Sequence, residues 1–277
     1  MKREKPVQEL RGKRVLVTGG ASGIGKAIAM RFCAEGSELV LVDIDEEGLQ
    51  KTACEIESLG GKASVYQADL MDRSQVELLQ AKVKEKVGPP DVVVNVAGIA
   101  LVAPFEEIPV DLWERVIGLN LMGYVYVTHY FLPDMIARGS GHIANVASAA
   151  GLFGMPFQAP YSAAKFGVVG MSEVLRWEMS RYGIGVTTVC PGSINTPIVE
   201  RATCIGFDDA KVRRSGYAIA ASPERLALAV VRGIKKDRAL VVFPRFVRSI
   251  WWLKRMSPAL GDVMGKGFTR LFDWQHK

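Results

Sequence analysis

The chain has 277 residues, of which 49% are hydrophobic and 23% charged, so it is long enough to bury a sizeable core. Its four cysteines lack CxxC spacing, which argues against a zinc ribbon, a redox pair or a disulfide framework, and we predict no metal site. A charged N-terminal segment and the lack of any long apolar run argue against a secreted or membrane-spanning protein. We therefore expect a cytoplasmic protein.

Positive charge is concentrated at the C-terminal end of the chain. Residues 232–277 hold eleven Lys or Arg and three Asp, a net charge of +8, which leaves −2 for the residues before them. If the protein binds an anionic partner, we therefore expect residues 232–277 to make the contact. Because no helix-turn-helix, zinc finger or single-strand platform is readable, we expect no nucleic-acid partner.

Short apolar segments alternate with longer segments of helical period from residue 14 to about residue 242. Strands are predicted at 14–18, 38–42, 63–67, 91–94, 142–146, 186–189 and 239–242. Helices are predicted at 23–35, 46–59, 73–87, 111–137, 160–182 and 223–235. Several strands are apolar throughout, as parallel strands covered by helices on both faces require. The pattern predicts a single-domain, doubly wound, seven-stranded parallel α/β sheet.

A glycine-rich turn joins the first predicted strand to the first predicted helix. It contains Gly19, Ser22, Gly23, Ile24 and Gly25. Glycines permit a sharp turn and a close backbone approach to a pyrophosphate, and the helix N-terminus offers free N–H groups to that anion. We predict a Rossmann-type dinucleotide site in a domain spanning residues 1–243, followed by a basic aromatic extension at 244–277.

Asp43 ends the second predicted strand, 18 positions beyond Gly25. A carboxylate at this place can accept hydrogen bonds from both ribose hydroxyls of an adenosine, and it would repel the 2′-phosphate of NADP. No Lys or Arg stands in the turn or at residues 43–47 to bind an additional phosphate. The sequence therefore favours NAD over NADP.

The third and fourth predicted strands end in further candidates for cofactor binding. These are Asp69, Leu70, Asn95, Ala97 and Gly98. The carboxyl ends of parallel strands line the nucleotide crevice of a doubly wound sheet. Asp69 is a plausible partner for the adenine amino group, whereas the role favoured for Asn95 is to cross-link the backbone of neighbouring strands.

Three polar residues around the fifth predicted strand carry the candidate chemistry. Ser148 follows that strand, and Tyr161 and Lys165 lie four residues apart on the next predicted helix. This spacing puts the phenol and the amine on one helix face. A neighbouring ammonium favours the phenolate, so we expect the pKa of Tyr161 to fall below its usual value near 10. The pair could then give or take a proton.

In combination, these motifs resemble those of the short-chain dehydrogenase/reductase family over about residues 10–242. The matching residues are Thr18-Gly19-x-x-x-Gly23-x-Gly25, Asn95-x-Ala97-Gly98, Asn120, Ser148, Tyr161-x-x-x-Lys165 and Pro191-Gly192. Val96 departs from the second Asn that many relatives have at that position.

The resemblance implies roles for individual residues. Tyr161 would be the general acid/base, Lys165 would bind the nicotinamide ribose, Ser148 would hydrogen-bond the substrate oxygen, and Asn120 would hold a water linking Lys165 to solvent. The residues that would contact the nicotinamide end are Pro191, Gly192 and Thr196. The family further implies a homodimer or homotetramer.

These features predict an NAD-preferring oxidoreductase that interconverts an apolar ketone and a secondary alcohol. Apolar residues in the segments 152–157 and 194–221 could wall a lipophilic pocket, or could equally belong to the core or to a subunit interface. A 3-oxoacyl-thioester reductase, acting on acyl-carrier or coenzyme-A substrates, is the enzymatic alternative. An NAD-sensing scaffold is the non-enzymatic one.

The extension mixes Phe and Trp with regularly placed cations from residue 245 to residue 277. Such a composition suits an interfacial helix on an anionic bilayer, so peripheral membrane contact is one expectation for this segment. Packing on a partner subunit or over the substrate entrance is the alternative.

Overall fold

The structure, a computed structural model, describes residues 9–218 and 220–273, and its main feature is a seven-stranded parallel sheet. The strand order is β3-β2-β1-β4-β6-β7-β9, so the order reverses between β1 and β4. This reversal is the topological switch point at which doubly wound sheets bind ligands. The predicted fold class is confirmed. Residues 1–8 of the predicted catalytic domain and 274–277 of the predicted extension lie outside the described residues.

All seven predicted strands are present. They are β1 (Arg14–Thr18), β2 (Glu38–Asp43), β3 (Lys62–Gln67), β4 (Val92–Asn95), β6 (Gly141–Val146), β7 (Ile184–Pro191) and β9 (Leu240–Phe243). Every residue of β4, β6 and β7 is buried, because helices cover both faces of the sheet. Since the strands are parallel, their carboxyl ends meet at one edge.

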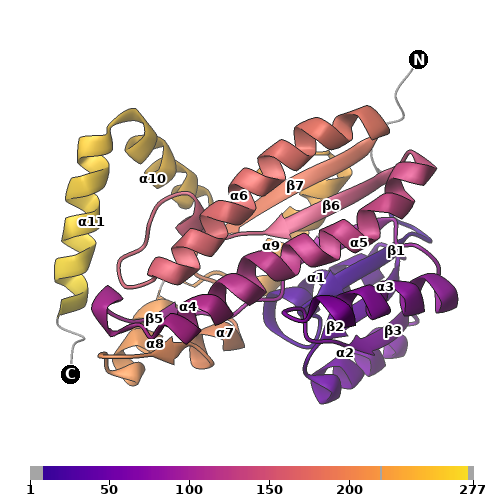
Figure 1. The fold of residues 1–277 in the computed structure, drawn as a ribbon, viewed down its shortest axis with the longest axis horizontal. Coiled ribbons are helices and arrows are strands. Elements are labelled where there is room, and N and C mark those ends of the chain that lie inside the picture. The colour runs from indigo at the N-terminus through magenta and orange to yellow at the C-terminus, as the bar shows by residue number, and fades with distance from the viewer. Residues whose placement is uncertain (1–8, 219, 274–277) are drawn as a thin grey trace.

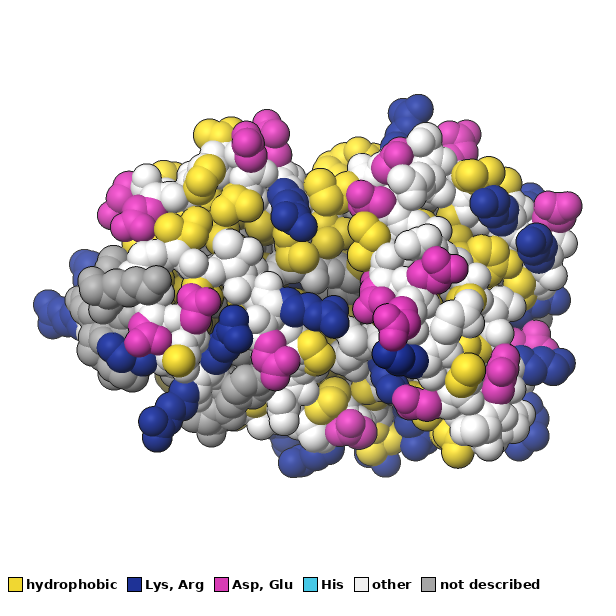
Figure 2. All heavy atoms as spheres, turned by 90° about the horizontal axis from the view of Figure 1, so that it is seen from below, with side chains coloured by type: hydrophobic (Ala, Val, Ile, Leu, Met, Phe, Trp, Pro, Cys, Tyr) yellow, Lys and Arg dark blue, Asp and Glu magenta, His cyan; other side chains and the backbone are white. Residues whose placement is uncertain are grey.

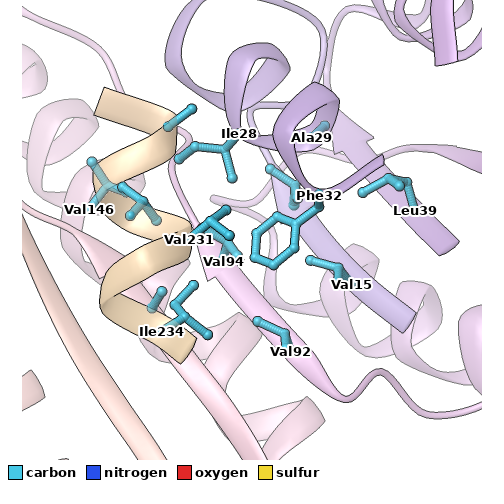
Figure 3. Close-up of a cluster of buried hydrophobic side chains, with 14 of the residues drawn as sticks. Val15, Ile28, Ala29, Phe32, Leu39, Val92, Val94, Val146, Val231 and Ile234 are labelled. Atoms are coloured by element: carbon cyan, nitrogen blue, oxygen red, sulfur yellow. The ribbon is translucent and has the colours of Figure 1, made fainter. Parts of the chain in front are cut away.

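Helices form a layer on each face of the sheet (Figure 1). One layer contains α1 (Gly23–Ala34), α2 (Glu46–Ser58) and α9 (Pro223–Lys235), and the other contains α3 (Arg73–Lys86), α5 (Gly123–Arg138) and α6 (Ala159–Met179). Figure 3 shows Phe32 of α1 and Val231 of α9 meeting over Val92 and Val94 of β4. This packing fixes the N-terminus of α1 above the switch point.

The segment predicted as one helix at 111–137 is divided into three pieces. These are α4 (Val110–Ile117), a π-helical turn at Gly118–Met122, and α5. The wider turn contains the buried Asn120, whose side chain is hydrogen-bonded to a neighbouring loop. Single π-turns of this kind are frequent at functional sites.

The segment between β7 and α9 has structure that the sequence pattern did not predict. It contains α7 (Pro197–Glu200), β8 (Thr203–Cys204) and α8 (Asp209–Ala218), and β8 pairs in parallel with β5 (Leu101–Val102). After β9 come α10 (Arg245–Met256) and α11 (Pro258–Asp273), at the same end of the molecule as β5, α7 and α8 (Figure 1). Among the described helices, none is both long and apolar enough to cross a membrane.

Candidate active site

A cleft of about 500 Å³ opens at the carboxyl edge of the sheet, over the ends of β1, β2, β3 and β4. The face drawn in Figure 2 is hollowed near its middle, with hydrophobic side chains along the border of the hollow. The predicted cofactor residues that line the cleft are Gly19, Ser22, Gly23, Ile24, Gly25, Asp43, Asp69, Leu70, Ala97, Gly98 and Thr196. The structure therefore brings together residues from five parts of the sequence at the switch point.

The glycine-rich turn leaves no room for side chains at positions 19 and 25. A Cβ on Gly25 would overlap the carbonyl oxygen of Gly19, and a Cβ on Gly19 would lie 3.0 Å from the amide nitrogen of Ala97. Gly19 also has a φ of +68°, a conformation that glycine adopts without strain. The turn is therefore fixed in a shape that exposes its backbone to the cleft.

The N-terminus of α1 is suited to an anion. Its N-cap residue, Ser22, makes no side-chain capping hydrogen bond, and the first turn of the helix contains no acidic residue. The backbone N–H groups of this turn are thus left for another acceptor, and the helix dipole favours a negative one. A pyrophosphate meets both requirements.

The Asp43 carboxylate is oriented by two backbone amides. Its Oδ2 accepts a hydrogen bond from Ala21 N at 3.1 Å, and its Oδ1 accepts one from Asp45 N at 3.1 Å. A carboxylate has about four acceptor positions, so two of them stay available on the side chain that lines the cleft. Two free acceptor positions match the two hydroxyls of a ribose.

The Asn95 side chain has the cross-linking role expected for it, and Asn95 is not among the residues that line the cleft. This side chain is fully buried beneath the cleft, where its Nδ2 donates to Asn145 Oδ1 at 2.8 Å and to Thr128 Oγ1 at 3.3 Å. It joins β4 to β6 and α5, and so acts as a cross-link between neighbouring elements.

Tyr161 and Ser148 meet near the same edge of the sheet. The two side chains are hydrogen-bonded, and Ser148 Oγ also accepts from Ala150 N at 3.1 Å. Tyr161 packs in a cluster with Ile99, a residue of the cleft wall. A Cβ on the cleft residue Gly98 would lie 3.7 Å from Lys165 Nζ. The candidate catalytic group therefore adjoins the cofactor cleft.

The expectation that Lys165 makes Tyr161 acidic is not met. Burial raises the pKa of Tyr161 above its usual value, and the hydrogen bond with Ser148 only partly offsets this effect. Burial likewise lowers the pKa of Lys165 to about 7, which weakens the charge that was to stabilise a phenolate. Lys165 Nζ lies 5.7 Å from the centre of the Tyr161 ring. Burial thus favours the protonated form of the phenol.

Tyr124 is a site residue that the sequence pattern did not reveal. Lys165 Nζ donates to Tyr124 Oη at 3.3 Å and to the Val146 carbonyl oxygen at 3.0 Å, and Tyr124 Oη donates to the same carbonyl at 3.0 Å. Lys165 and Tyr124 are only 3% and 1% exposed. The amine is therefore oriented by a buried network on the α5 side of the site.

Asn120 holds the loop that follows β4. Its Oδ1 accepts from Ile99 N and its Nδ2 donates to Ile99 O, both at 2.9 Å. A Cβ on Gly98 would overlap Asn120 Oδ1, so the π-turn and this loop are tightly apposed. The amide of Asn120 thus positions the loop residues that separate the cleft from Lys165.

The remaining predicted nicotinamide contacts differ in their placement. Thr196 lines the cleft opposite Gly23, whose Cβ would lie 3.3 Å from Thr196 Cβ. Pro191 ends β7 and is buried, and Gly192 N donates to Phe243 O at 2.7 Å. Neither Pro191 nor Gly192 belongs to the cleft wall described above.

Two of the apolar residues that could have formed either a pocket wall or part of the core, Phe157 and Phe207, pack against each other. Phe207 is fully buried, and its ring lies edge-on to Phe157 at 4.9 Å between centroids. Ile198 does line the cleft, as do two cations that the sequence pattern did not indicate, Arg115 and Arg201. The cleft therefore combines an apolar wall with positive charge.

Taken together, the helix N-terminus without a side-chain cap, the close-packed glycine-rich turn and the free acceptors of Asp43 fit a nicotinamide dinucleotide. A doubly wound sheet with this cleft and an adjoining Ser148–Tyr161 pair defines a dinucleotide-dependent oxidoreductase of the Rossmann class.

Comparisons with known proteins agree with this class. A family model described as short chain dehydrogenase matches residues 13–203. The chain is 41% identical over 192 residues to the 3-oxoacyl-acyl-carrier-protein reductase FabG of Thermotoga maritima, which covers 69% of this chain and 78% of that protein. The chain belongs to the short-chain dehydrogenase/reductase family and is an oxidoreductase acting on carbonyl or CH–OH groups.

Solved structures are similar over most of their length. A short-chain dehydrogenase/reductase from Burkholderia phymatum in complex with NAD has a TM-score of 0.85 and 25% identity, covering 92% of this chain and 96% of that one. A variant of an actinorhodin polyketide ketoreductase with NADPH has a TM-score of 0.74 and 32% identity, covering 86% and 97%. Both nicotinamide cofactors therefore occur among the structural neighbours.

Proposed function

We propose that this protein interconverts an apolar ketone and a secondary alcohol, with Tyr161 as the general acid/base. The observation that carries the proposal is a partly buried phenol, hydrogen-bonded to Ser148, next to a cleft that fits a nicotinamide dinucleotide. The chemistry that this cofactor supplies when bound is hydride transfer to or from carbon.

In the direction of reduction, Tyr161 donates its proton to the carbonyl oxygen as negative charge develops there. Ser148 donates a hydrogen bond to the same oxygen and stabilises that charge. Because burial raises the pKa of Tyr161, the proton is present at neutral pH. In the direction of oxidation Tyr161 must first lose its proton, so we expect alcohol oxidation to accelerate as pH rises.

Lys165 contributes by position and by charge. Its Nζ is fixed by Tyr124 and by the Val146 carbonyl, beside the Gly98 end of the cleft. From there its donors can hold the ribose of the nicotinamide half. Asn120 keeps the intervening loop in place through both hydrogen bonds to Ile99, and we propose that it also holds a water between Lys165 and solvent.

Asp43 supports a preference for NAD. Its two free acceptor positions suit ribose hydroxyls, and its charge opposes a 2′-phosphate. Arg115 and Arg201 also line the cleft, but neither belongs to the turn or to the segment after β2. We therefore attribute the preference for NAD over NADP to the Asp43 carboxylate at the end of β2.

A thioester reductase is the second candidate, and Arg115 and Arg201 favour it. Both side chains are exposed at the cleft. Guanidinium groups bind phosphates well, and acyl-carrier and coenzyme-A thioesters both carry them. The 41% identity to a 3-oxoacyl-acyl-carrier-protein reductase supports the same candidate.

A substrate panel followed at 340 nm separates these candidates. We expect NADH-dependent reduction of apolar ketones, with kcat/KM rising with the apolar size of the ketone. Higher kcat/KM for 3-oxoacyl thioesters, lost in the Arg115→Glu/Arg201→Glu double variant, would instead assign the second activity. Inactivity toward both classes, with NADH binding intact, contradicts the proposal.

We propose that the protein forms a homodimer or homotetramer. Helix α6 exposes three large apolar side chains, Phe166, Val174 and Trp177, of the kind that subunit interfaces bury. Light scattering should give a dimer or tetramer that Trp177→Glu weakens, and a monomeric wild type would contradict this assignment.

A further inference from the structure

The two C-terminal helices form a hairpin that the proposed reaction does not use. α10 and α11 are joined at Ser257 and pack on each other at one end of the molecule (Figure 1). We call this pair of helices the C-terminal hairpin. Its place after β9, the last strand of the sheet, sets it at the carboxyl edge, where the cleft also opens.

One face of the hairpin is already occupied by the body of the protein. Val247 is buried, and Ile250, Lys254, Met264 and Phe268 surround a small cavity of about 60 Å³ against the loop after Ser148. The members of that loop in the cavity wall are Phe153, Gly154, Met155 and Pro156. This contact, together with the packing of Trp251 on a core cluster that includes Leu152 and Val168, attaches the hairpin to the protein.

A second apolar set points away from that contact. Trp252 is 49% exposed, Met256 77% and Val263 66%. Phe246, Leu253 and Leu260 are exposed as well. Large apolar side chains gathered on consecutive turns of two helices mark an interaction surface rather than scattered surface residues. Packing among the described residues therefore leaves one face of this amphipathic hairpin exposed.

The exposed apolar residues are accompanied by positive charge. Residues 245–270 contain six cations and one acid, Asp262. Asp262 pairs with Lys266 at 2.6 Å, while Lys254 and Arg255 lie over aromatic rings. Within the described part of the chain, no carboxylate forms an ion pair with Arg245, Arg248 or Arg270. The surface thus joins an apolar stripe to uncompensated cations.

This combination selects one kind of partner. An anionic phospholipid surface neutralises the cations, each contributing about 1 kcal/mol, and accepts Trp, Leu and Met side chains at headgroup depth. A nucleic acid would engage the cations but would leave the apolar stripe in water. We propose that the C-terminal hairpin docks the protein on anionic phospholipid bilayers.

Docking has a consequence for the active site, and this consequence rests on the proposed function. The hairpin contacts Phe153 and Met155, only a few residues after Ser148. A bilayer held against the hairpin therefore lies near the edge of the sheet where the substrate oxygen is expected. Because the hairpin and the active site lie at the same edge of the sheet, we expect docking to bring the active site close to a ketone dissolved in the membrane.

Sedimentation of the full chain with vesicles tests docking without any assay of activity. We expect binding to phosphatidylcholine vesicles that contain phosphatidylserine, weakening as salt is raised, and little binding to pure phosphatidylcholine. The Trp252→Glu/Met256→Glu and Arg245→Glu/Arg248→Glu double variants should each bind at least about tenfold more weakly. Leu59→Glu, which changes an exposed apolar residue on the distant α2 side, is the matched control.

Two outcomes overturn docking: no sedimentation of the wild type, or equal sedimentation of wild type and hairpin variants. A loss of self-association in the Trp252→Glu/Met256→Glu variant, without vesicle binding by the wild type, would make a second copy of the chain the occupant. A water-soluble ketone should be reduced equally by the wild type and the hairpin variants, whereas a vesicle-borne ketone should be reduced more slowly by the variants. Vesicle binding without turnover of any ketone would refute the proposed function and leave docking standing.

Discussion

Replacing Asp43 by Ala should reverse the cofactor preference. The carboxylate uses two of its four acceptor positions on Ala21 N and Asp45 N, which leaves two for ribose hydroxyls. A hydrogen bond to a charged group contributes about 1.5 kcal/mol, so losing two costs about 3 kcal/mol, or about 100-fold in kcat/KM for NADH. For NADPH the substitution removes a repulsive charge, so its kcat/KM should not fall. The ratio of the two values should thus shift by at least about 100-fold.

The same substitution removes the acceptors of two backbone amides, so thermal unfolding must be followed alongside the kinetics. Asp43→Asn is the matched variant, since it keeps one acceptor oxygen and the side-chain volume but loses the charge. It should give an intermediate ratio. An unchanged NADPH to NADH ratio in a stably folded Asp43→Ala protein would refute the role assigned to this carboxylate.

Three further predictions concern the turn, the lysine network and the sheet. Gly25→Ala should weaken NADH binding by more than about tenfold, because its Cβ overlaps Gly19 O, whereas Gly170→Ala, whose Cβ meets open space, should bind NADH normally in fluorescence titrations. Tyr124→Phe removes one hydrogen-bond acceptor of Lys165, so the pH midpoint above which NADH affinity is lost should move down by about one pH unit. Tyr126→Phe is the control. An unchanged midpoint in Tyr124→Phe would exclude a role of this hydrogen bond in NADH binding. Burial lowers the pKa of His142 in β6 from 6.5 to about 4. Between these two pH values the unfolded chain binds a proton that the folded chain does not, so the free energy of unfolding rises as the pH rises from 4 to 6.5. Urea unfolding should show about 3 kcal/mol less stability at pH 4 than at pH 7 from this group, a contribution that His142→Gln should abolish.

The sequence was sufficient for the sheet and for the cleft because both depend on strong local signals. The continuous apolar runs of β4 and β7 require burial on both faces, which only a covered parallel sheet provides. The glycines after β1 and Asp43 at the end of β2 then had to meet at the switch point.

Other features depend on contacts between distant segments, which periodicity does not encode. The π-turn at Asn120 is stabilised by hydrogen bonds to Ile99, and β5 pairs with β8 about a hundred residues away. The burial of the Asn95 side chain and the hydrogen bond from Lys165 to Tyr124 likewise depend on how the helices pack on the sheet. A strand-end or helical position does not reveal such partners.

The pKa of Tyr161 was predicted in the wrong direction for a related reason. Spacing on a helix indicates that an amine is near a phenol, but it does not indicate how deeply either group is buried. Desolvation raises the pKa of the phenol and lowers that of Lys165, so it dominates the mutual attraction that the spacing suggests. The favoured state is a neutral acid ready to donate.

The most direct test of Tyr161 as the proton donor is the turnover of Tyr161→Phe at saturating NADH and ketone. We expect a kcat at least about 100-fold below that of the wild type, with NADH affinity and thermal stability preserved. Turnover close to that of the wild type would contradict it and would assign the proton to another group.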